Sequence, residues 1–444
     1  MMKAMIIGSG GREHAIAEAF ARSKKIGKIF VSPGNPGMNK IAEPLLTKDF
    51  RELYEVICSR KVDLVFIGPE QPLKDGLSDY LMHKGIKVVG PSREAAQLET
   101  SKVFSKNFMR RYRIPTSNYA VFSEYREAAS FIMNITEANN SDTGLLESTA
   151  AHDNTDKPNR YPLVIKADGL AAGKGVIIAQ NKEEALAALN KMMFTKEFGG
   201  AGDRVIIEDY LYGSEASVFA FTDGRDFEMT ILSRDYKKAL DNDNGLNTGG
   251  MGAFAPVSMS DEIVSEIKEK VFYPLLNGLL SESIEYKGVI YAGLMLTKQG
   301  LHVLEFNCRL GDPETQAVLP LLETDFIDIC DAVTDNKIKR LELKWKSLAA
   351  VSVVAASQGY PGKYESGKLI SIDPTLLEQE SLRLYFSNVE ENEEKKMVSS
   401  GGRVLTLTAL APTIAQARIK AYDHIERIKF SNKFYRTDIA LNNY

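Results

Sequence analysis

The stretch MIIGSGGREHA, residues 5–15, decides the fold of the first part of the chain. An apolar run stops at Gly8, two more glycines follow at Gly10 and Gly11, and the residues after them favour a helix. A strand that turns into a helix at glycine directs several unpaired backbone N–H groups, and the positive end of the helix dipole, at one point in space. The stretch therefore predicts an anion site, although a tight turn without a ligand also explains the glycines.

The spacing is an incomplete copy of the dinucleotide-binding pattern G-x-G-x-x-G. The third glycine would fall at Glu13, and the second strand ends in Ser32 and Pro33 instead of an acidic residue that binds ribose hydroxyls. We therefore expect a single phosphate on a small sugar at this loop rather than NAD.

Four short apolar runs alternate with helical segments in the first 91 residues; they lie at 5–8, 29–31, 64–68 and 86–90. This alternation predicts a parallel sheet with helices on both faces. Ligands bind at the carboxyl ends of such strands, so the loops at 8–11, 33–37 and 68–71 are expected to meet at one crevice.

Composition excludes several classes of protein. A length of 444 residues favours two to four domains, and a net charge of -4 with a pI near 5.9 argues against a nucleic-acid surface. One helix is expected at about 92–112, and the basic cluster at 106–113 is interpreted as a solvated helix face. The three cysteines lack paired spacing, which fits a reducing compartment, and no apolar run has the length of a signal or membrane segment. We expect a cytoplasmic protein.

The most informative stretch is YPLVIKADGLAAGKGVII, residues 161–178. Two predicted strands flank a loop that holds Gly169, Gly173 and Gly175, with Lys166 before the loop and Lys174 within it. Small residues let backbone amides close over a polyphosphate, and lysines supply mobile cations for its charge. The loop is not a Walker loop, because the chain returns as a strand. A glycine-rich hairpin with surface lysines remains the alternative.

Two later segments complete a nucleotide site. An apolar strand at 205–209 ends in acidic residues and Tyr210–Leu211, which suits an adenine slot with Glu215 near the ribose hydroxyls. A strand near 300–307 places Glu305 and Asn307 on one face, and a carboxylate beside an amide oxygen suits magnesium shared with phosphates.

Taken together, six motifs resemble those of the ATP-grasp ligases, and more closely those of the phosphoribosylamine-glycine ligase family of purine biosynthesis. They are GSGGREHA (8–15), GPEQPL (68–73), KADGLAAGKGV (166–176), NTGGMG (247–252), EFNCRLGDPETQ (305–316) and GGRVL (401–405). Their order matches the family, and the resemblance spans nearly the whole chain.

The resemblance implies an α/β multidomain fold. An N-terminal Rossmann-like parallel-sheet domain is expected at 1–100, a central ATP-grasp domain at 101–333, and a smaller C-terminal α+β domain at 334–444. The ATP-grasp domain would include a lid subdomain at about 115–190, with a polar surface insertion at 134–161.

The implied reaction joins glycine to 5-phosphoribosylamine through a glycyl phosphate and gives glycinamide ribonucleotide, ADP and phosphate. ATP is the co-substrate and magnesium or manganese the metal. We expect a monomer that acts on these small molecules, with no nucleic-acid or membrane partner.

Site residues follow from matching positions. The expected ATP site contains Lys102, Lys166, Gly169, Gly173, Lys174, Gly175, Glu208, Tyr210, Leu211 and Glu215. The expected substrate site contains Gly10, Gly11, Arg12, Glu13, Asn35, Pro69, Glu70, Asn247, Thr248, Gly249, Gly250, Asp312, Glu314, Gly402 and Arg403. Glu305 and Asn307 would bind the metal. In catalysis, Lys174 would neutralise the transferred phosphoryl group, Arg309 would fix the glycine carboxylate or steady that group, and Asp235 would hold the glycine ammonium.

The chain departs from the family at two places in the substrate loop. Leu246 stands where the family commonly has proline, and residues 234–238 read RDYKK where it commonly has QDHKR. The nearest alternative is a sibling ATP-grasp ligase that acts on another purine intermediate. A dinucleotide oxidoreductase would need the missing glycine, and a non-catalytic nucleotide sensor would not explain Arg309 beside Glu305 and Asn307.

Overall fold

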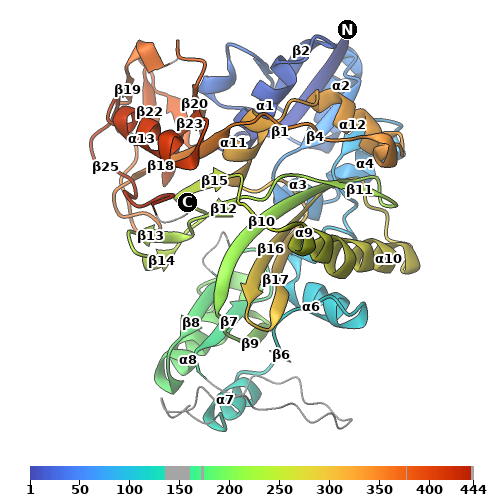
Figure 1. Ribbon diagram of the computed structural model, residues 1–444, viewed down its shortest axis with the longest axis vertical. Coiled ribbons are helices and arrows are strands. Elements are labelled where there is room, and N and C mark those ends of the chain that lie inside the picture. Colours follow the sequence, from blue (N-terminus) through green and yellow to red (C-terminus); the bar gives the residue numbers. More distant parts are fainter. Residues whose placement is uncertain (136–160, 172–174, 377, 442–444) are drawn as a thin grey trace.

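A computed structural model describes residues 1–135, 161–171, 175–376 and 378–441. The N-terminal part is a five-stranded parallel sheet in the order β3-β2-β1-β4-β5 (Figure 1). Its strands are β1 (Met2–Gly8), β2 (Ile26–Pro33), β3 (Glu43–Pro44), β4 (Leu64–Ile67) and β5 (Lys87–Val89). The predicted parallel sheet is confirmed.

Helices cover both faces of this sheet because alternate side chains of β1 enter different cores. Met5 and Ile7 share one core cluster with residues of α2 (Phe50–Arg60) and α4 (Leu77–His83). Ile6 shares another cluster with residues of α1 (Gly11–Ala21) and of the distant α12 (Phe326–Thr334).

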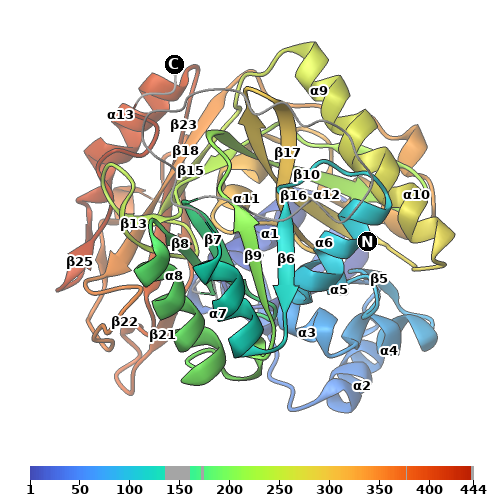
Figure 2. The same ribbon diagram turned by 90° about the horizontal axis from the view of Figure 1, so that it is seen from below.

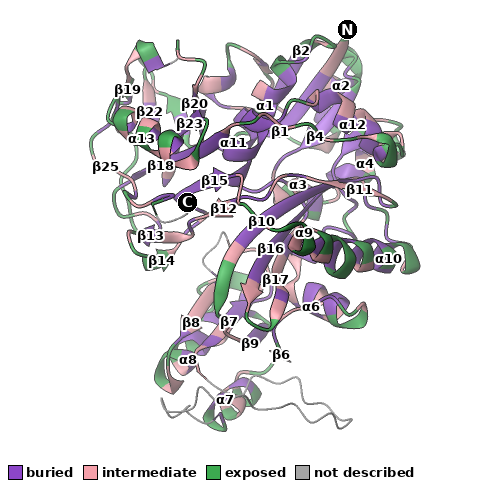
Figure 3. Ribbon diagram, viewed as in Figure 1, coloured by how far each residue is buried: buried purple, intermediate pink, exposed green. Residues whose placement is uncertain are grey.

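The centre of the molecule is a four-stranded antiparallel sheet in the order β11-β10-β16-β17. Its strands are β10 (Gly213–Thr222), β11 (Phe227–Met229), β16 (Gly288–Thr297) and β17 (Gly300–Asn307), with α9 (Asp261–Ile267) and α10 (Tyr273–Ser281) beside them. Figure 3 shows long buried stretches in β10 and β16, whereas α9 and α10 keep one face exposed.

A second four-stranded sheet, β6-β9-β7-β8, forms the lower lobe in Figure 1 and faces the viewer in Figure 2. It contains β6 (Tyr119–Phe122), β7 (Leu163–Ala167), β8 (Val176–Ala179) and β9 (Val205–Asp209). Residues of α7 (Tyr125–Met133) and α8 (Lys182–Leu189) share its core cluster.

The C-terminal sheet includes strands from the middle of the chain. Its order is β12-β15-β18-β23-β20, with β25 (Lys433–Phe434) paired to β18. The strands β18 (Ala349–Ser357), β20 (Leu382–Phe386) and β23 (Arg403–Ala411) and helix α13 (Ile414–Ile425) come from the last third of the chain. The strands β12 (Arg234–Asp235) and β15 (Gly252–Ala255) do not, and they tie the substrate loop to this sheet.

Three sequence predictions need correction or fall outside the described residues. The helix expected near 92–112 is two helices, α5 (Gln97–Thr100) and α6 (Lys102–Arg111), separated by the extended Ser101 that caps α6. In the cluster at 106–113, Lys106 is only 2% exposed, so the interpretation as a solvated face is wrong for this residue. The insertion at 134–161 lies, except for its ends, outside the described residues. Within the described part of the chain, no helix combines the length and apolarity needed to cross a membrane.

Candidate functional site

One large cleft, with a volume of about 820 Å³, lies between the lobes and is lined by residues of the central sheet, the lower lobe and the C-terminal sheet, and by helices that follow strands of the N-terminal sheet. Arg12 reaches it from the first turn of α1 and Glu70 from the start of α3 (Glu70–Lys74), while Lys166 and Glu208 come from the lower lobe and Arg403 from the C-terminal sheet. The cleft therefore joins the three parts of the chain at one place.

The end of the cleft where the sequence predicts the nucleotide contains a buried triad of ion-paired side chains. The Glu208 carboxylate on β9 lies 2.9 Å from Lys106 Nζ and 3.0 Å from Lys166 Nζ. Lys106 also donates to the hydroxyls of Thr116 and Ser117. Although burial opposes ionisation, the two lysines lower the pKa of Glu208 to about 2, and burial lowers the pKa of Lys106 to about 8.

The predicted adenine slot is apolar. Tyr210 and Leu211 line the cleft, as do apolar side chains that include Val164, Met295 and Leu304. Glu208 and Glu215 also line it, as expected. This surface can receive a flat base, because burial of apolar area favours binding and the flanking backbone offers polar groups.

The glycine loop is partly described. Lys102, the first residue of α6, donates from Nζ to the carbonyl of Gly169, 3.2 Å away. A Cβ on Gly169 would lie 2.9 Å from the Cα of Ala201, so a larger residue would displace the backbone there. Gly175 lines the cleft, whereas Gly173 and Lys174 lie outside the described residues.

The predicted metal ligands lie together on β17. Glu305 pairs with Gly293 and Asn307 with Tyr291 of β16, and both side chains line the cleft. Burial opposes ionisation of Glu305, but Lys237, Lys166 and Lys102 lower its pKa. Within the described residues neither side chain has a hydrogen bond or an ion pair.

This donor set fits a hard divalent cation, which prefers carboxylate and amide oxygens. Among the described residues, no group of three or more His, Cys, Asp or Glu side chains is arranged to hold a metal. A cation at Glu305 and Asn307 would therefore need further oxygens, which phosphates can supply.

A second charged group faces these ligands. Lys237 Nζ lies 3.3 Å from the Glu215 carboxylate, and Asp235, Glu215 and Glu305 raise the pKa of Lys237 although burial opposes its charge. Burial raises the pKa of Asp235 to about 7, despite the nearby Lys237. The pKa of Glu314 is also raised by burial.

Arg309 lies between two carboxylates. Its Nη2 is 2.7 Å from Glu99 and its Nε 3.2 Å from Glu70, so the guanidinium is held from two sides. Burial opposes ionisation of Glu70, yet Arg309 and Arg12 lower its pKa to about 2. Glu99 also accepts the Cys308 N–H at 2.7 Å, which fixes the backbone beside Asn307.

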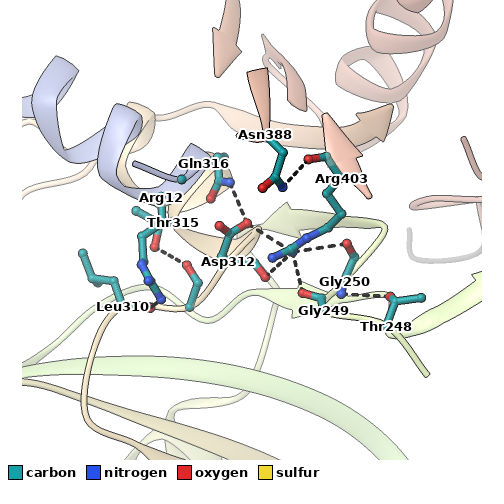
Figure 4. A network of polar contacts seen from close by, with 12 residues as sticks. Arg12, Thr248, Gly249, Gly250, Leu310, Asp312, Thr315, Gln316, Asn388 and Arg403 are labelled. Atoms are coloured by element: carbon teal, nitrogen blue, oxygen red, sulfur yellow. Dashed lines mark hydrogen bonds and ion pairs between the residues drawn. The ribbon is translucent and has the colours of Figure 1, made fainter. Parts of the chain in front are cut away.

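Arg403 joins the C-terminal sheet to two loops of the cleft (Figure 4). Its Nη1 donates to the carbonyls of Gly249 and Asp312, at 2.5 and 2.8 Å, and lies 3.2 Å from the Asp312 carboxylate. Gly250 has φ +107, and a Cβ there would lie 2.4 Å from the Pro313 ring, so both loops require this glycine.

The N-terminus of α1 already holds carboxylates. The Gly10 N–H donates to Glu13 Oε2 at 2.7 Å, and the Asp312 carboxylate lies near this turn, 3.6 Å from where a Cβ on Gly10 would stand. Asn35 donates to the carbonyls of Ser9 and Phe386, at 2.7 and 2.8 Å. The loops at 8–11, 33–37 and 68–71, which the sequence predicts to converge, do meet. Many of their hydrogen-bond donors, however, are already bound to acceptors of the protein.

The predicted substrate residues therefore divide into two sets. Those that line the cleft are Arg12, Glu70, Asn247, Thr248, Gly249, Asp312, Glu314, Gly402 and Arg403. Those that do not line it are Gly10, Gly11, Glu13, Asn35, Pro69 and Gly250.

Sequence reasoning missed several residues of the cleft; they are Glu99, Lys106, Lys237, Tyr291, Tyr360 and Asn388. Lys237 belongs to the RDYKK segment, and Glu99 lies three residues before Lys102. Lys237 lies in a segment already compared with the family and Glu99 lies near a predicted ATP-site residue, so a search for charged residues around these positions would have found them.

Comparisons with known proteins agree with this geometry. Residues 2–99, 100–315 and 350–442 match the family descriptions of the N domain, the ATP-grasp (A) domain and the C domain of phosphoribosylglycinamide synthetase. A phosphoribosylamine–glycine ligase from Caldanaerobacter subterraneus subsp. tengcongensis is 43% identical over 442 residues, covering 99% of both chains. One from Escherichia coli O157:H7 is 39% identical, covering 99% of this chain and 98% of its own.

Solved structures give the same result. A crystal structure of phosphoribosylamine–glycine ligase from Thermotoga maritima superposes with a TM-score of 0.83 at 33% identity, covering 99% of this chain and 100% of its own. The biotin carboxylase domain of 2-oxoglutarate carboxylase from Hydrogenobacter thermophilus, at 13% identity and a TM-score of 0.69, shares the fold. It covers 97% of this chain and 91% of its own.

Proposed function

Because the chain belongs to the phosphoribosylglycinamide synthetase family, we propose that the cleft described above performs both halves of the ligation of glycine to 5-phosphoribosylamine. The reaction consumes ATP and gives glycinamide ribonucleotide, ADP and phosphate, so the protein is a carbon–nitrogen ligase of purine biosynthesis. The observation that carries the proposal is the convergence of Lys102, Lys166, Glu305, Asn307 and Asp235 on one cleft.

The first half-reaction activates the glycine carboxylate. A carboxylate is a poor electrophile, and transfer of the γ-phosphoryl group of ATP makes it an acyl phosphate. Lys102 and Lys166 would neutralise charge on the phosphates. Glu305 and Asn307 would hold the divalent metal, magnesium or manganese, which supplies positive charge to phosphate oxygens when bound.

Glycine would lie between a carboxylate and a guanidinium. Asp235 is proposed to accept hydrogen bonds from the glycine ammonium, and Arg309 to fix the carboxylate or steady the moving phosphoryl group. Glu70 and Glu99 hold the Arg309 guanidinium in one orientation, which lowers the cost of aligning the reacting atoms. Lys174 remains a proposed catalytic cation of the glycine loop.

In the second half-reaction, the amine of phosphoribosylamine attacks the acyl phosphate and inorganic phosphate leaves. Water must be kept out, because it would hydrolyse the intermediate. We propose that Arg12 and Arg403 face the sugar phosphate. The loop at Gly10–Gly11 would contact the sugar phosphate only if the phosphate took the place of the Asp312 carboxylate near this loop, or lay beside that carboxylate.

Other features of the chain remain proposals. We propose domains at 1–100, 101–333 and 334–444 with a lid at about 115–190. We also propose a cytoplasmic location, which is supported by three free cysteines. The expected monomer stays a prediction.

The test is ADP release by the full-length enzyme with glycine alone, phosphoribosylamine alone, and both together. We expect rapid, stoichiometric turnover only with both substrates. Equal ADP release without glycine would contradict the proposed function. Turnover with a different purine-pathway amine or carboxylate, in place of these two, would instead identify a sibling ATP-grasp ligase.

A further inference from the structure

Arg436 is a buried cation outside the cleft that the ligation has not yet explained. Its side chain is 1% exposed, in the C-terminal segment that follows β25. A buried guanidinium is costly unless its donors are satisfied. Arg436 meets this condition with partners on both sides: Asp438 on its own segment, and the residues around 236–243 on the substrate loop.

The contacts of Arg436 form a fork. Nε and Nη2 donate to the two oxygens of Asp438, at 2.8 and 2.7 Å. Nη1 donates to the Lys238 carbonyl and to the Asp243 carboxylate, each at 3.0 Å. Asp438 also accepts the Asn242 N–H at 2.8 Å, so both ends of the hairpin formed by β13 (Lys238–Leu240) and β14 (Asn244–Asn247) are tied to one buried group.

The Arg436 guanidinium also lies over the ring of Tyr236, the residue between Asp235 and Lys237 of the cleft. Its carbon lies 4.9 Å from the centre of the Tyr236 ring, and the Tyr236 hydroxyl accepts the Ala440 N–H at 2.9 Å. Tyr236 belongs to the core of the C-terminal sheet. Its neighbours Asp235 and Lys237 line the cleft, so the position of Tyr236 fixes where both charged side chains begin.

We propose that Arg436 is a positioning residue for the ligation: it holds residues 236–243 from behind, so that Asp235 and Lys237 face the bound glycine in a fixed arrangement. This inference rests on the proposed function only for the role of Asp235 in glycine binding. Arg436 itself touches neither substrate nor metal.

The test uses Arg436→Lys in the full-length enzyme. Lysine keeps the charge but cannot satisfy Asp438, Asp243 and the Lys238 carbonyl at once. The KM for glycine is expected to rise on the order of tenfold while the KM for ATP stays within about twofold, because small misplacements of binding groups weaken one substrate's alignment.

The matched control is Thr413→Ala. Thr413 caps α13 through its hydroxyl in the same domain, and its side-chain hydrogen bonds within the described residues go to Gln416 and not to residues 234–247. This variant is expected to lower the melting temperature and leave every KM unchanged. A wild-type KM for glycine in Arg436→Lys, with only a lowered melting temperature, would overturn the proposal.

Two further variants keep the test decisive. If Arg436→Lys does not fold, Asp243→Ala removes one hydrogen-bond acceptor of Arg436 at a side chain that is 66% exposed, and an unchanged glycine KM there overturns the proposal. Asp235→Asn distinguishes the proposed glycine binding by Asp235 from the proposed positioning by Arg436. A wild-type glycine KM in Asp235→Asn would refute the role of Asp235, and with it the positioning. A raised KM in Asp235→Asn beside a wild-type KM in Arg436→Lys would refute the positioning alone.

Discussion

At the scale of single residues, the cleft is a set of charges whose ionisation is controlled by burial and by neighbours of opposite charge. Glu305 and Glu70 stay ionised because cations surround them, whereas burial prevails at Asp235, as it does at Glu314. A carboxyl that titrates near neutral pH beside a substrate site makes substrate binding depend on pH.

Asp235 should therefore impose a pH dependence on the use of glycine. Below its pKa of about 7 the carboxyl is protonated and cannot balance the glycine ammonium. The kcat/KM for glycine, measured with saturating ATP and phosphoribosylamine, is expected to rise roughly tenfold per pH unit below that pKa and to level off above it. The same raised pKa means that folding stability falls as the pH rises through about 7.

Asp235→Asn is the control, since its amide does not titrate. This variant should lose the rising limb and have a low kcat/KM at every pH. A wild-type profile that is flat between pH 6 and 8 would contradict the assignment.

A place in the cleft could be expected from sequence for residues in specific motifs, but not for residues whose burial depends on the fold. Glu305, Asn307 and Arg309 lie in the cleft as their spacing and motif predicted. The basic neighbours of Lys106 predict a solvated helix face for this residue. Only the fold reveals that its side chain is buried against Glu208. Burial of a lysine depends on a partner distant in sequence, which no local pattern reveals.

At the scale of elements, α1 shows how a glycine pattern can be altered without losing the fold. The position of the missing third glycine holds Glu13, whose carboxylate caps the Gly10 N–H. A Cβ on Gly68 would lie 2.5 Å from Glu13 Cγ. The Glu13 side chain therefore fits only because glycine follows β4 at this position. The strand, turn and helix were predictable from local sequence, but the presence of the Glu13 and Asp312 carboxylates near the helix N-terminus was not.

His14 on the same helix should make the contact between α1 and β20 sensitive to acid. Its Nδ1 accepts the Phe386 N–H at 3.0 Å, and burial lowers the pKa of His14 to about 4. Because the folded pKa lies below the ordinary 6.5, His14 stabilises the fold above that pH, and this stability is lost as the pH falls through about 4. The expected loss is about 2 kcal/mol by pH 5.

The measurement is the free energy of unfolding between pH 7 and 5, compared with His14→Gln. Glutamine offers an acceptor oxygen that does not titrate, so its stability should fall less steeply. Parallel curves for the two proteins would show that His14 does not control this contact.

At the scale of the whole molecule, the parts of the chain are interleaved. Strands β12 and β15 from the middle of the chain extend the C-terminal sheet, and α12 packs on the N-terminal sheet, where Phe326 meets Phe20 with ring centres 5.1 Å apart. Sequence motifs predicted the order of the parts but not these exchanges, because pairing of distant strands leaves no local signal. The exchanges place Asp235 and Arg403 beside Glu305 in one cleft.

The central claim is that this cleft activates the glycine carboxylate by phosphorylation before the amine attacks. The direct measurement is a reaction with glycine whose carboxylate oxygens are ¹⁸O, followed by mass spectrometry of the products. If an acyl phosphate forms, one labelled oxygen leaves with the phosphoryl group, so each inorganic phosphate should carry one ¹⁸O and glycinamide ribonucleotide should keep the other. Inorganic phosphate without ¹⁸O, formed together with glycinamide ribonucleotide, would contradict the account.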